Sequence, residues 1–273
     1  MKYSVLMSVY QKDDPAYLQW ALASIYEEQT RKPDEIVVVF DGPLGAELHA
    51  VLDAFRKEKE NIVFYYPQPI NRGLGETLRI GSEYCTGDYI FRMDSDDISH
   101  PRRFEKQIAY LEAHPEVDVL GTDISEFYES PDEGNLRVRA CPAEHDDIVK
   151  MGKKRNPMNH VTVCMKKEAL QRCGGYESLL LLEDYYLWLK MMVAGCRLAN
   201  LNETLVYVRI GNDFHKKRGA VTRVQGWKCL QEYMLSHGMI KKREAMMNMV
   251  YIRAFVYCPG WLKRLVYDQV LRK

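Results

Sequence analysis

The sequence lacks several features that would place the protein in a specialised class. Its longest apolar runs, such as IVVVF at 36–40, are far shorter than the roughly 20 residues that cross a bilayer. The seven cysteines are scattered and contain no C-x-x-C pair, so neither a disulfide framework nor a structural zinc site is indicated. Glycine and proline are sparse, which excludes collagen-like chains. The first residues do not resemble a secretory signal. We expect a folded, cytoplasmic protein.

The formal net charge is zero, but the charges are unevenly distributed. Residues 205–273 contain 14 Lys or Arg and four Asp or Glu, so this stretch carries +10 and the preceding residues −10. Its charges alternate with large apolar residues, as in MMNMVYIRAFVY at 246–257. This pattern suits an interfacial helix better than an arm that binds nucleic acid. Two interpretations stay open, namely a helix on an anionic membrane and a helix packed on the rest of the chain or on a second subunit. Trp261, Leu262, Leu265 and Val266 would share the apolar face of such a helix.

Hydrophobic periodicity in the first part predicts strands and helices that alternate around a parallel sheet. The expected strands span residues 3–9, 35–40, 62–66, 89–93 and 117–121, and the expected helices span 15–29, 48–55, 74–83 and 99–114. After the polar segment 129–135 we expect strands over 161–165, 198–201 and 205–208, a helix over 184–193 and two or three helices from 222. The pattern predicts an α/β domain over 1–210 and a basic helical extension over 211–273.

The sharpest local signal is Asp94-Ser95-Asp96-Asp97, where the strand YIFRM ends. Side chains alternate along a strand, so Asp94 and Asp96 can point the same way at its carboxyl end. That edge of an open parallel sheet is where ligands bind. A divalent cation shared with a diphosphate, Mg²⁺ or Mn²⁺, would relieve the repulsion between the two carboxylates. The structural alternative is that these acids cap a turn and a helix.

A second acidic pair, Glu183-Asp184, begins the predicted helix EDYYLWLKMM. The positive end of a helix dipole favours the ionised carboxylate, which can then accept a proton. Acidic residues at helix starts are common, so this pair taken alone favours a structural role.

Taken together, these segments resemble family 2 inverting glycosyltransferases of GT-A fold. The resemblance rests on the order SVLMSVY, FDGP, NRGLGETLRIG, YIFRMDSDD, GGY and LLEDYYLWLK across residues 1–210. It is greatest to bacterial enzymes that build O-antigen and exopolysaccharide repeat units. The resemblance implies a Rossmann-like, mostly parallel sheet flanked by helices, and transfer of a hexose or N-acetylhexosamine from a UDP-sugar to a hydroxyl of a glycan acceptor, such as one linked to undecaprenyl diphosphate. Such an acceptor would bring the protein to the cytoplasmic face of a membrane.

The resemblance also implies roles for individual residues on the donor side. Asp41 matches an aspartate that receives the uracil N3–H, and Asp94 matches an acid that contacts the ribose and the metal ion. Asp96 matches the acid that ligates the Mn²⁺ or Mg²⁺ holding the diphosphate. The remaining positions expected to border the nucleotide are Ser8, Val9, Tyr10, Arg72, Gly73 and Ser95.

On the acceptor side, the resemblance assigns Asp184 as the general base that removes the proton of the acceptor hydroxyl. Glu183 is expected to orient the acceptor or a nearby backbone amide. Trp188 is a candidate platform for a sugar ring, and a core role is the alternative. Asn156 and His160 lie in the stretch that borders the acceptor, although a single histidine before a strand is commonly structural.

Two departures from the family pattern affect these expectations. The turn after the second strand contains Asp41 as its only carboxylate, because Phe40 and Pro43 stand where the family has Asp and Ser. The Arg-x-His of many relatives is absent as well. Arg209, His215 and Arg218 are instead expected to contact a diphosphate, because Arg suits phosphate oxygens, and His215 is not assigned to the metal ion.

Two other functions are compatible with parts of the sequence. A nucleotidyltransferase also combines an α/β fold with aspartates at strand ends, but no Gly-rich phosphate loop with a nearby Lys follows the first strand. A non-catalytic scaffold that binds sugar nucleotides would not need acidic residues at all three expected places, which are Asp41, Asp94–Asp97 and Glu183–Asp184. The oligomeric state, the donor sugar and the acceptor hydroxyl do not follow from the sequence.

Overall fold

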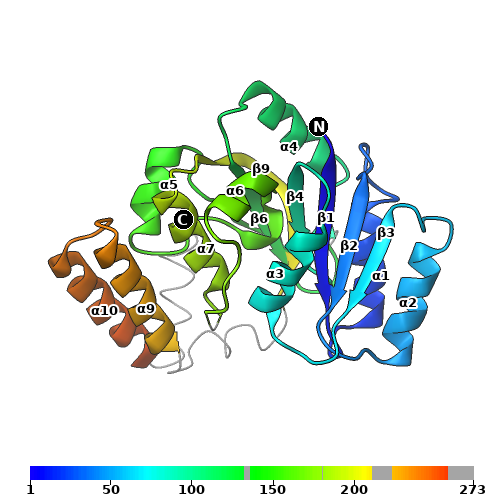
Figure 1. The fold of residues 1–273 in the computed structure, drawn as a ribbon, viewed down its shortest axis with the longest axis horizontal. Coiled ribbons are helices and arrows are strands. Elements are labelled where there is room, and N and C mark those ends of the chain that lie inside the picture. The colour runs from blue at the N-terminus through cyan, green and yellow to red at the C-terminus, as the bar shows by residue number, and fades with distance from the viewer. Residues whose placement is uncertain (132–135, 180, 211–222, 258–273) are drawn as a thin grey trace.

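The computed structural model describes residues 1–131, 136–179, 181–210 and 223–257 (Figure 1). In this part of the chain the strands form a single sheet in the order β3-β2-β1-β4-β8-β6-β9-β5, and β7 pairs with β6. The first half of the sheet is parallel. It consists of β1 (Tyr3–Val9), β2 (Glu35–Phe40), β3 (Val63–Pro67) and β4 (Tyr89–Met93).

The second half of the sheet mixes strand directions. The central strand β6 runs antiparallel to β8 and β7 and parallel to the long strand β9, and β5 pairs antiparallel with β9. The bounds are β5 (Ile98–Ser99), β6 (Val119–Phe127), β7 (Arg137–Arg139), β8 (Cys164–Lys166) and β9 (Leu198–Arg209).

Helices cover both faces of the sheet because residues of each central strand alternate between two cores. Val5 and Met7 of β1 face the core formed with α1, α2 and α4, whereas Leu6 faces the core formed with α3, α5, α6 and α7. These helices are α1 (Pro15–Ile25), α2 (Ala46–Arg56), α3 (Leu74–Tyr84), α4 (Arg103–Ala113), α5 (His145–Gly152), α6 (Lys167–Arg172) and α7 (Glu183–Val193).

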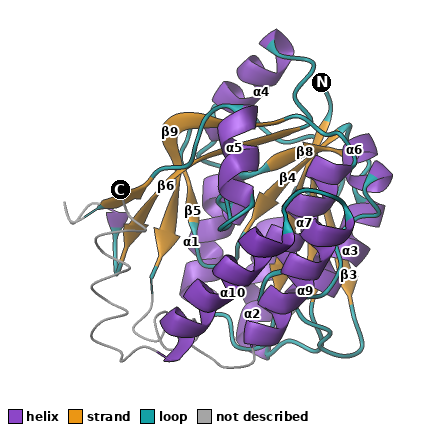
Figure 2. Cartoon of the chain, turned by 90° about the vertical axis from the view of Figure 1, so that its left-hand side faces the viewer, coloured by secondary structure: helices purple, strands orange, loops and turns teal. Residues whose placement is uncertain are grey.

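The helical hairpin of α9 (Arg223–Ser236) and α10 (Lys242–Tyr257) packs on α7 at one end of the molecule (Figures 1 and 2). Leu230 and Met234 of α9 are fully buried against Tyr185 and Leu189 of α7. The helices predicted from residue 222 onward are therefore present. No helix in the described ranges is long and apolar enough to cross a bilayer.

Several element predictions were wrong, for physical reasons. The strand expected over 161–165 begins later, because residues 160–162 form a 3₁₀ turn, η2 (His160–Thr162), and the short β8 starts at Cys164. The two strands expected over 198–208 are the single strand β9, whose pairing with β6 shifts register beside Thr122 and Asp123. The helix expected from Ser99 begins at Arg103, because Ser99 pairs with β9 as part of β5. The strands β5 and β7 were not predicted.

Candidate active site at the carboxyl ends of the strands

Three aspartates gather directly after β4, at the carboxyl edge of the parallel strands. A carboxylate oxygen from each of Asp94, Asp96 and Asp97 can lie within 4.8 Å of the others. Asp96 is exposed, Asp94 is half-buried and Asp97 is buried. Although Asp96 reaches solvent, the protein around its carboxyl group displaces part of its hydration, and this desolvation together with the negative charges of Asp94 and Asp13 raises the pKa of Asp96 to about 6. The cluster concentrates negative charge and offers only oxygen ligands, which suits a hard divalent cation.

Arg92 partly neutralises this cluster from inside the protein. It precedes Asp94 by two residues, so both side chains lie on the same face of the strand. The guanidinium binds both oxygens of Asp94, with Nη1 donating to Oδ2 at 2.5 Å and Nη2 to Oδ1. The Arg92 side chain is only 3% exposed, whereas that of Asp94 is 33% exposed. Asp94 is thus held in one orientation at the rim of the site.

Arg209, at the end of β9, fastens the DSDD turn to the second half of the sheet. Its backbone N–H donates to Oδ1 of Asp97 at 2.8 Å, and its Nε donates to the carbonyl oxygen of Asp96 at 3.2 Å. Nη1 donates to the carbonyl oxygens of Tyr128 and Glu129, and the guanidinium lies 3.8 Å from the centre of the Tyr17 ring. Nη2 is buried and has no hydrogen-bond partner among the described residues, so it is the nitrogen left for the predicted phosphate contact of Arg209.

Asp13 is a site residue that the sequence analysis missed. Its Oδ2 accepts hydrogen bonds from Ser95 Oγ at 2.7 Å and from the backbone N–H of Tyr10 at 3.0 Å. Burial raises the pKa of Asp13 to about 6, and the negative charges of Asp94 and Asp41 add to this effect. Asp13 therefore joins the segment after β1 to the DSDD turn. The available signal was an acidic residue three positions after Tyr10, just before α1.

Asp41 holds the loop that leads into α3. Its two carboxylate oxygens accept the backbone N–H groups of Arg72, at 2.6 Å, and Gly73, at 3.1 Å. A side chain at Gly42, where φ is +90°, would approach the backbone nitrogen of Asn71 to 2.8 Å. Glycine at 42 thus lets the two loops touch. The Asp41 carboxylate is committed to this loop, and a uracil contact would need its remaining lone pairs.

On the other side of the site, Asp184 lies in the first turn of α7. Its Oδ2 accepts a hydrogen bond from Asn156 Nδ2 at 2.5 Å, and its Oδ1 accepts one from the backbone N–H of Tyr185 at 2.7 Å. Burial raises the pKa of Asp184 above its usual range, while these two hydrogen bonds and the positive charge of Arg92 oppose that rise. Burial also raises the pKa of the neighbouring Glu183. Both carboxyls can therefore exchange protons closer to neutrality than exposed acids do.

The donor-side loop and the start of α7 are in contact. A Cβ at Gly75, in the first turn of α3, would lie 3.2 Å from Cβ of Glu183 and 3.3 Å from Cα of Ser178. The two acidic groups also share one cation, because the charge of Arg92 acts on Asp94 and Asp96 and on Glu183 and Asp184.

Comparison with known proteins identifies the family. Residues 4–179 match the family model described as Glycosyl transferase family 2. The chain belongs to glycosyltransferase family 2. Among curated relatives of this transferase is the UDP-Gal:alpha-D-GlcNAc-diphosphoundecaprenol beta-1,3-galactosyltransferase of Escherichia coli, 33% identical over 273 residues, which are 100% of this chain and 97% of the relative. The amylovoran biosynthesis glycosyltransferase AmsE of Erwinia amylovora is 39% identical over 229 residues, 84% of this chain and 82% of the relative.

The transferase also shares its fold with solved glycosyltransferase structures. Staphylococcus aureus TarS superposes with a TM-score of 0.68 at 16% identity, over 99% of this chain and 46% of that protein. TarS residues 1–349 in complex with UDP-GlcNAc gives a TM-score of 0.66 at 17% identity, over 99% of this chain and 76% of that one. The predicted GT-A fold, an α/β sheet flanked by helices, is confirmed.

Of the predicted acceptor residues of the transferase, Trp188 is buried and His160 is half-buried. Trp188 is fully buried in the core between α7 and the sheet, so the exposed sugar platform predicted for it is wrong. His160 Nε2 lies 2.9 Å from Tyr176 Oη, and burial together with the charge of Arg92 lowers the pKa of His160 well below its usual value. His160 is therefore a neutral ring beneath the site.

The other positions predicted to border the nucleotide lie at the carboxyl edge of the parallel strands. Ser8 and Tyr10 are half-buried, and the side chain of Val9 is buried, so Val9 can offer only its backbone there. Arg72 is exposed on the loop that Asp41 holds. His215 and Arg218 lie outside the described residues.

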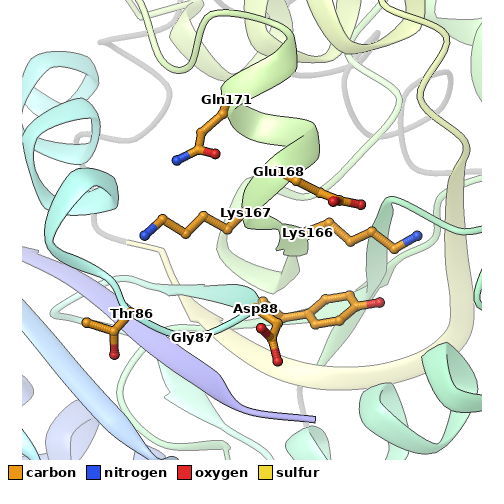
Figure 3. A pocket seen from close by; sticks show the side chains of 8 residues that line it. Thr86, Gly87, Asp88, Lys166, Lys167, Glu168 and Gln171 are labelled. Atoms are coloured by element: carbon orange, nitrogen blue, oxygen red, sulfur yellow. The ribbon is translucent and has the colours of Figure 1, made fainter.

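A separate hollow lies at the opposite edge of the sheet, where β4 begins (Figure 3). It measures about 490 Å³ and lies between residues 86–89 and the start of α6. Its two lysines are engaged within the protein, because Lys166 Nζ donates to the carbonyl oxygen of Pro115 and Lys167 Nζ to that of Cys85. The acids of the candidate active site, Asp94, Asp96, Glu183 and Asp184, do not line this hollow.

Proposed function

We propose that the protein is an inverting transferase that moves a hexose or N-acetylhexosamine from a UDP-sugar to a hydroxyl of a glycan carried on undecaprenyl diphosphate, in the synthesis of a bacterial surface polysaccharide. The observation that carries the proposal is the convergence of two acidic groups, Asp94–Asp97 and Glu183–Asp184, around the buried Arg92. The full-length similarity to an enzyme named for UDP-Gal and a diphosphoundecaprenol acceptor supports the substrate classes. Residues 1–210 would carry the reaction, at the cytoplasmic face of the membrane.

On the donor side, we assign the nucleotide to the edge formed by the ends of β1, β2 and β4. Asp41 fixes the loop of Arg72 and Gly73 beside that edge, and Asp13 fixes Tyr10 and Ser95. These bonds position backbone groups before a ligand arrives, which lowers the entropic cost of binding. A solved neighbour of the same fold holds UDP-GlcNAc.

The aspartate cluster fits a divalent cation of the Mg²⁺ or Mn²⁺ type. Asp96 is the most exposed of the three acids and is the principal ligand in this proposal. Asp94 faces the same space, but its two oxygens already bind Arg92. Asp97 is buried and bonds the backbone of Arg209, so we assign it a structural role. When bound, the cation would neutralise charge that develops on the departing diphosphate.

On the acceptor side, Asp184 is the proposed general base. The hydrogen bonds from Asn156 and Tyr185 orient its carboxylate. As the acceptor oxygen forms a bond to the anomeric carbon, the bond between that carbon and the diphosphate oxygen breaks and the hydroxyl proton passes to Asp184. UDP leaves with the electron pair of the broken bond. Attack opposite the leaving group inverts the configuration.

The proposal is tested by thermal unfolding with nucleotides and sugar nucleotides, each with and without Mn²⁺. A ligand at 100 times its Kd adds about 2.7 kcal/mol to the free energy of unfolding, which raises the melting temperature of a chain of this size by roughly 5–10 °C. We expect a metal-dependent shift with one UDP-sugar, and a smaller shift in Asp96→Ala. The selected donor is then assayed for transfer to a synthetic acceptor on a polyprenyl diphosphate. A shift with nucleoside triphosphates alone would favour a nucleotidyltransferase, and binding without transfer would favour a scaffold.

A further inference from the structure

The helix α10 is apolar on two opposite sides. Its inner side is covered, and Ala245 and Val256 are buried there. Its outer side exposes large hydrophobic side chains, each 43–68% accessible, at positions that recur with the helical period. They are Met246, Met247, Val250, Tyr251 and Tyr257. A helix that is hydrophobic all round is normally covered all round, so the outer side has the character of a contact surface.

The charges around this apolar stripe are almost all positive. Lys242, Arg243 and Arg253 are exposed on α10, and at helical spacing all three lie within or beside the stripe. Glu244 is the one acidic residue between 241 and 257, and its carboxylate accepts a hydrogen bond from the backbone N–H of Lys241 at 2.7 Å. An apolar stripe with cationic borders is the composition of helices that lie in the plane of an anionic membrane.

The charge favours lipid over a second copy of the chain as the occupant. A symmetric dimer through this side would set the cations of one α10 against those of the other, and Glu244 alone cannot offset them. An anionic bilayer instead supplies phosphates for the cations and an apolar layer for Met246 and Val250. Tyr251 and Tyr257 have the amphipathic rings that reside at the level of lipid headgroups.

The position of α10 connects this surface to the active site. Asn248 Nδ2 donates to the carbonyl oxygen of Lys153 at 2.9 Å, and Asn156, three residues further on, bonds Asp184. The α9–α10 hairpin also packs on α7, which carries Asp184 in its first turn (Figure 2). A surface bound through α10 would therefore lie on the acceptor side of the molecule.

We infer that the outer side of α10 docks the transferase on an anionic phospholipid surface. The inference deepens the proposed function and rests on it for its purpose, because an undecaprenyl-linked acceptor is presented at a membrane. The docking surface itself is argued from α10 alone, so the two can fail separately.

The test is co-flotation of the full chain with vesicles of phosphatidylglycerol and phosphatidylethanolamine, with phosphatidylcholine vesicles as the neutral reference. We expect binding to the anionic vesicles that weakens as NaCl is added. The double variant Val250→Glu/Tyr251→Glu should lower the binding constant at least tenfold. Arg243→Glu should lower it about fivefold or more, the effect of removing one cation from an anionic surface. The matched control is Lys57→Glu, which changes the exposed C-cap residue of α2 and should bind like the wild type. The helix α2 lies at the end of the molecule opposite the hairpin (Figure 1).

Transfer to a water-soluble short-chain acceptor separates the two proposals. Loss of vesicle binding with transfer retained supports the inference, whereas wild-type protein that binds vesicles without any transfer contradicts only the proposed function. Equal flotation of the double variant and the wild type, or no preference for anionic vesicles, would overturn the inference. Two further results would overturn the inference. One is a wild-type dimer, detected by light scattering, that becomes monomeric in the double variant, and the other is a melting temperature several degrees lower in the double variant. Either result would show that protein covers the stripe.

Discussion

The surroundings of the Asp184 carboxylate have opposite effects on its pKa. Burial favours its neutral form, and the hydrogen bonds from Asn156 and Tyr185 favour its ionised form. Asp184→Asn keeps the size of the side chain but cannot accept the proton. We expect kcat to fall by roughly 10²–10⁴ with the Kd for UDP unchanged, measured by initial rates and by calorimetry. Retained turnover would remove Asp184 as the base.

The pKa of Asp184 determines the expected pH dependence of transfer. The base acts only when ionised, and burial raises the pKa of Asp184, so activity should be lost as the pH falls through that raised pKa. Asn156→Ala removes a hydrogen bond that favours the ionised form, raises the pKa further and should shift the acidic limb of the kcat profile to higher pH. Glu76→Gln, which changes an acid of α3 that pairs with Arg79, is a control expected to leave the limb in place. An unshifted limb in Asn156→Ala would contradict the assignment.

Arg92 is the other residue on which the site depends. Replacing it with Met removes a cation that is 3% exposed and leaves Asp94 without its partner. Breaking a fully buried pair costs about 3–5 kcal/mol, and Asp94 is 33% exposed, so we expect the free energy of unfolding to fall by about 2–4 kcal/mol in urea. The double variant Arg92→Met/Asp94→Asn should recover part of that loss. Additive effects of the two substitutions would exclude a direct coupling.

At the scale of elements, the site depends on the contact between the start of α3 and the segment before α7. A methyl group at Gly75 would press on Glu183 and Ser178, so Gly75→Ala should separate the two elements by a few tenths of an ångström. We expect a loss of kcat of about tenfold or more, since small displacements of reacting groups are costly, with a stability change of about 1 kcal/mol. Gly45→Ala, where a Cβ meets nothing within 4 Å, is the control for both measurements.

At the scale of the whole molecule, α7 joins the sheet to the α9–α10 hairpin. Leu187, Trp188 and Met191 face the sheet core, whereas Tyr185 and Leu189 face the hairpin. Leu230→Ala opens a cavity at the second interface and should lower the free energy of unfolding by about 2–4 kcal/mol. If the hairpin and the sheet form one cooperative unit, circular dichroism and tryptophan fluorescence will follow a single urea transition. Two transitions would show that residues 211–273 unfold on their own, and Met247→Ala on the exposed side is the control.

Local hydrophobic periodicity was sufficient to predict the elements that bury continuous apolar surface. The strands β1, β2 and β4 appear with their predicted bounds, because strands covered on both faces read as apolar runs. The two-residue β5 and three-residue β7 have no such signal. They exist because β9 and β6, far away in sequence, offer edges to pair with.

The sequence by itself determined the family pattern, the order of the acids and the helices that follow residue 222. Only the tertiary structure decided what each side chain faces. Trp188 is enclosed because α7 is apolar around its circumference and is covered on two sides. Asp13, Arg92 and Arg209 acquire their roles through partners as much as 113 positions away. Sequence patterns report which residues prefer burial or turns, whereas packing selects the neighbours, and neighbours set the orientation and proton affinity of the acids at this site.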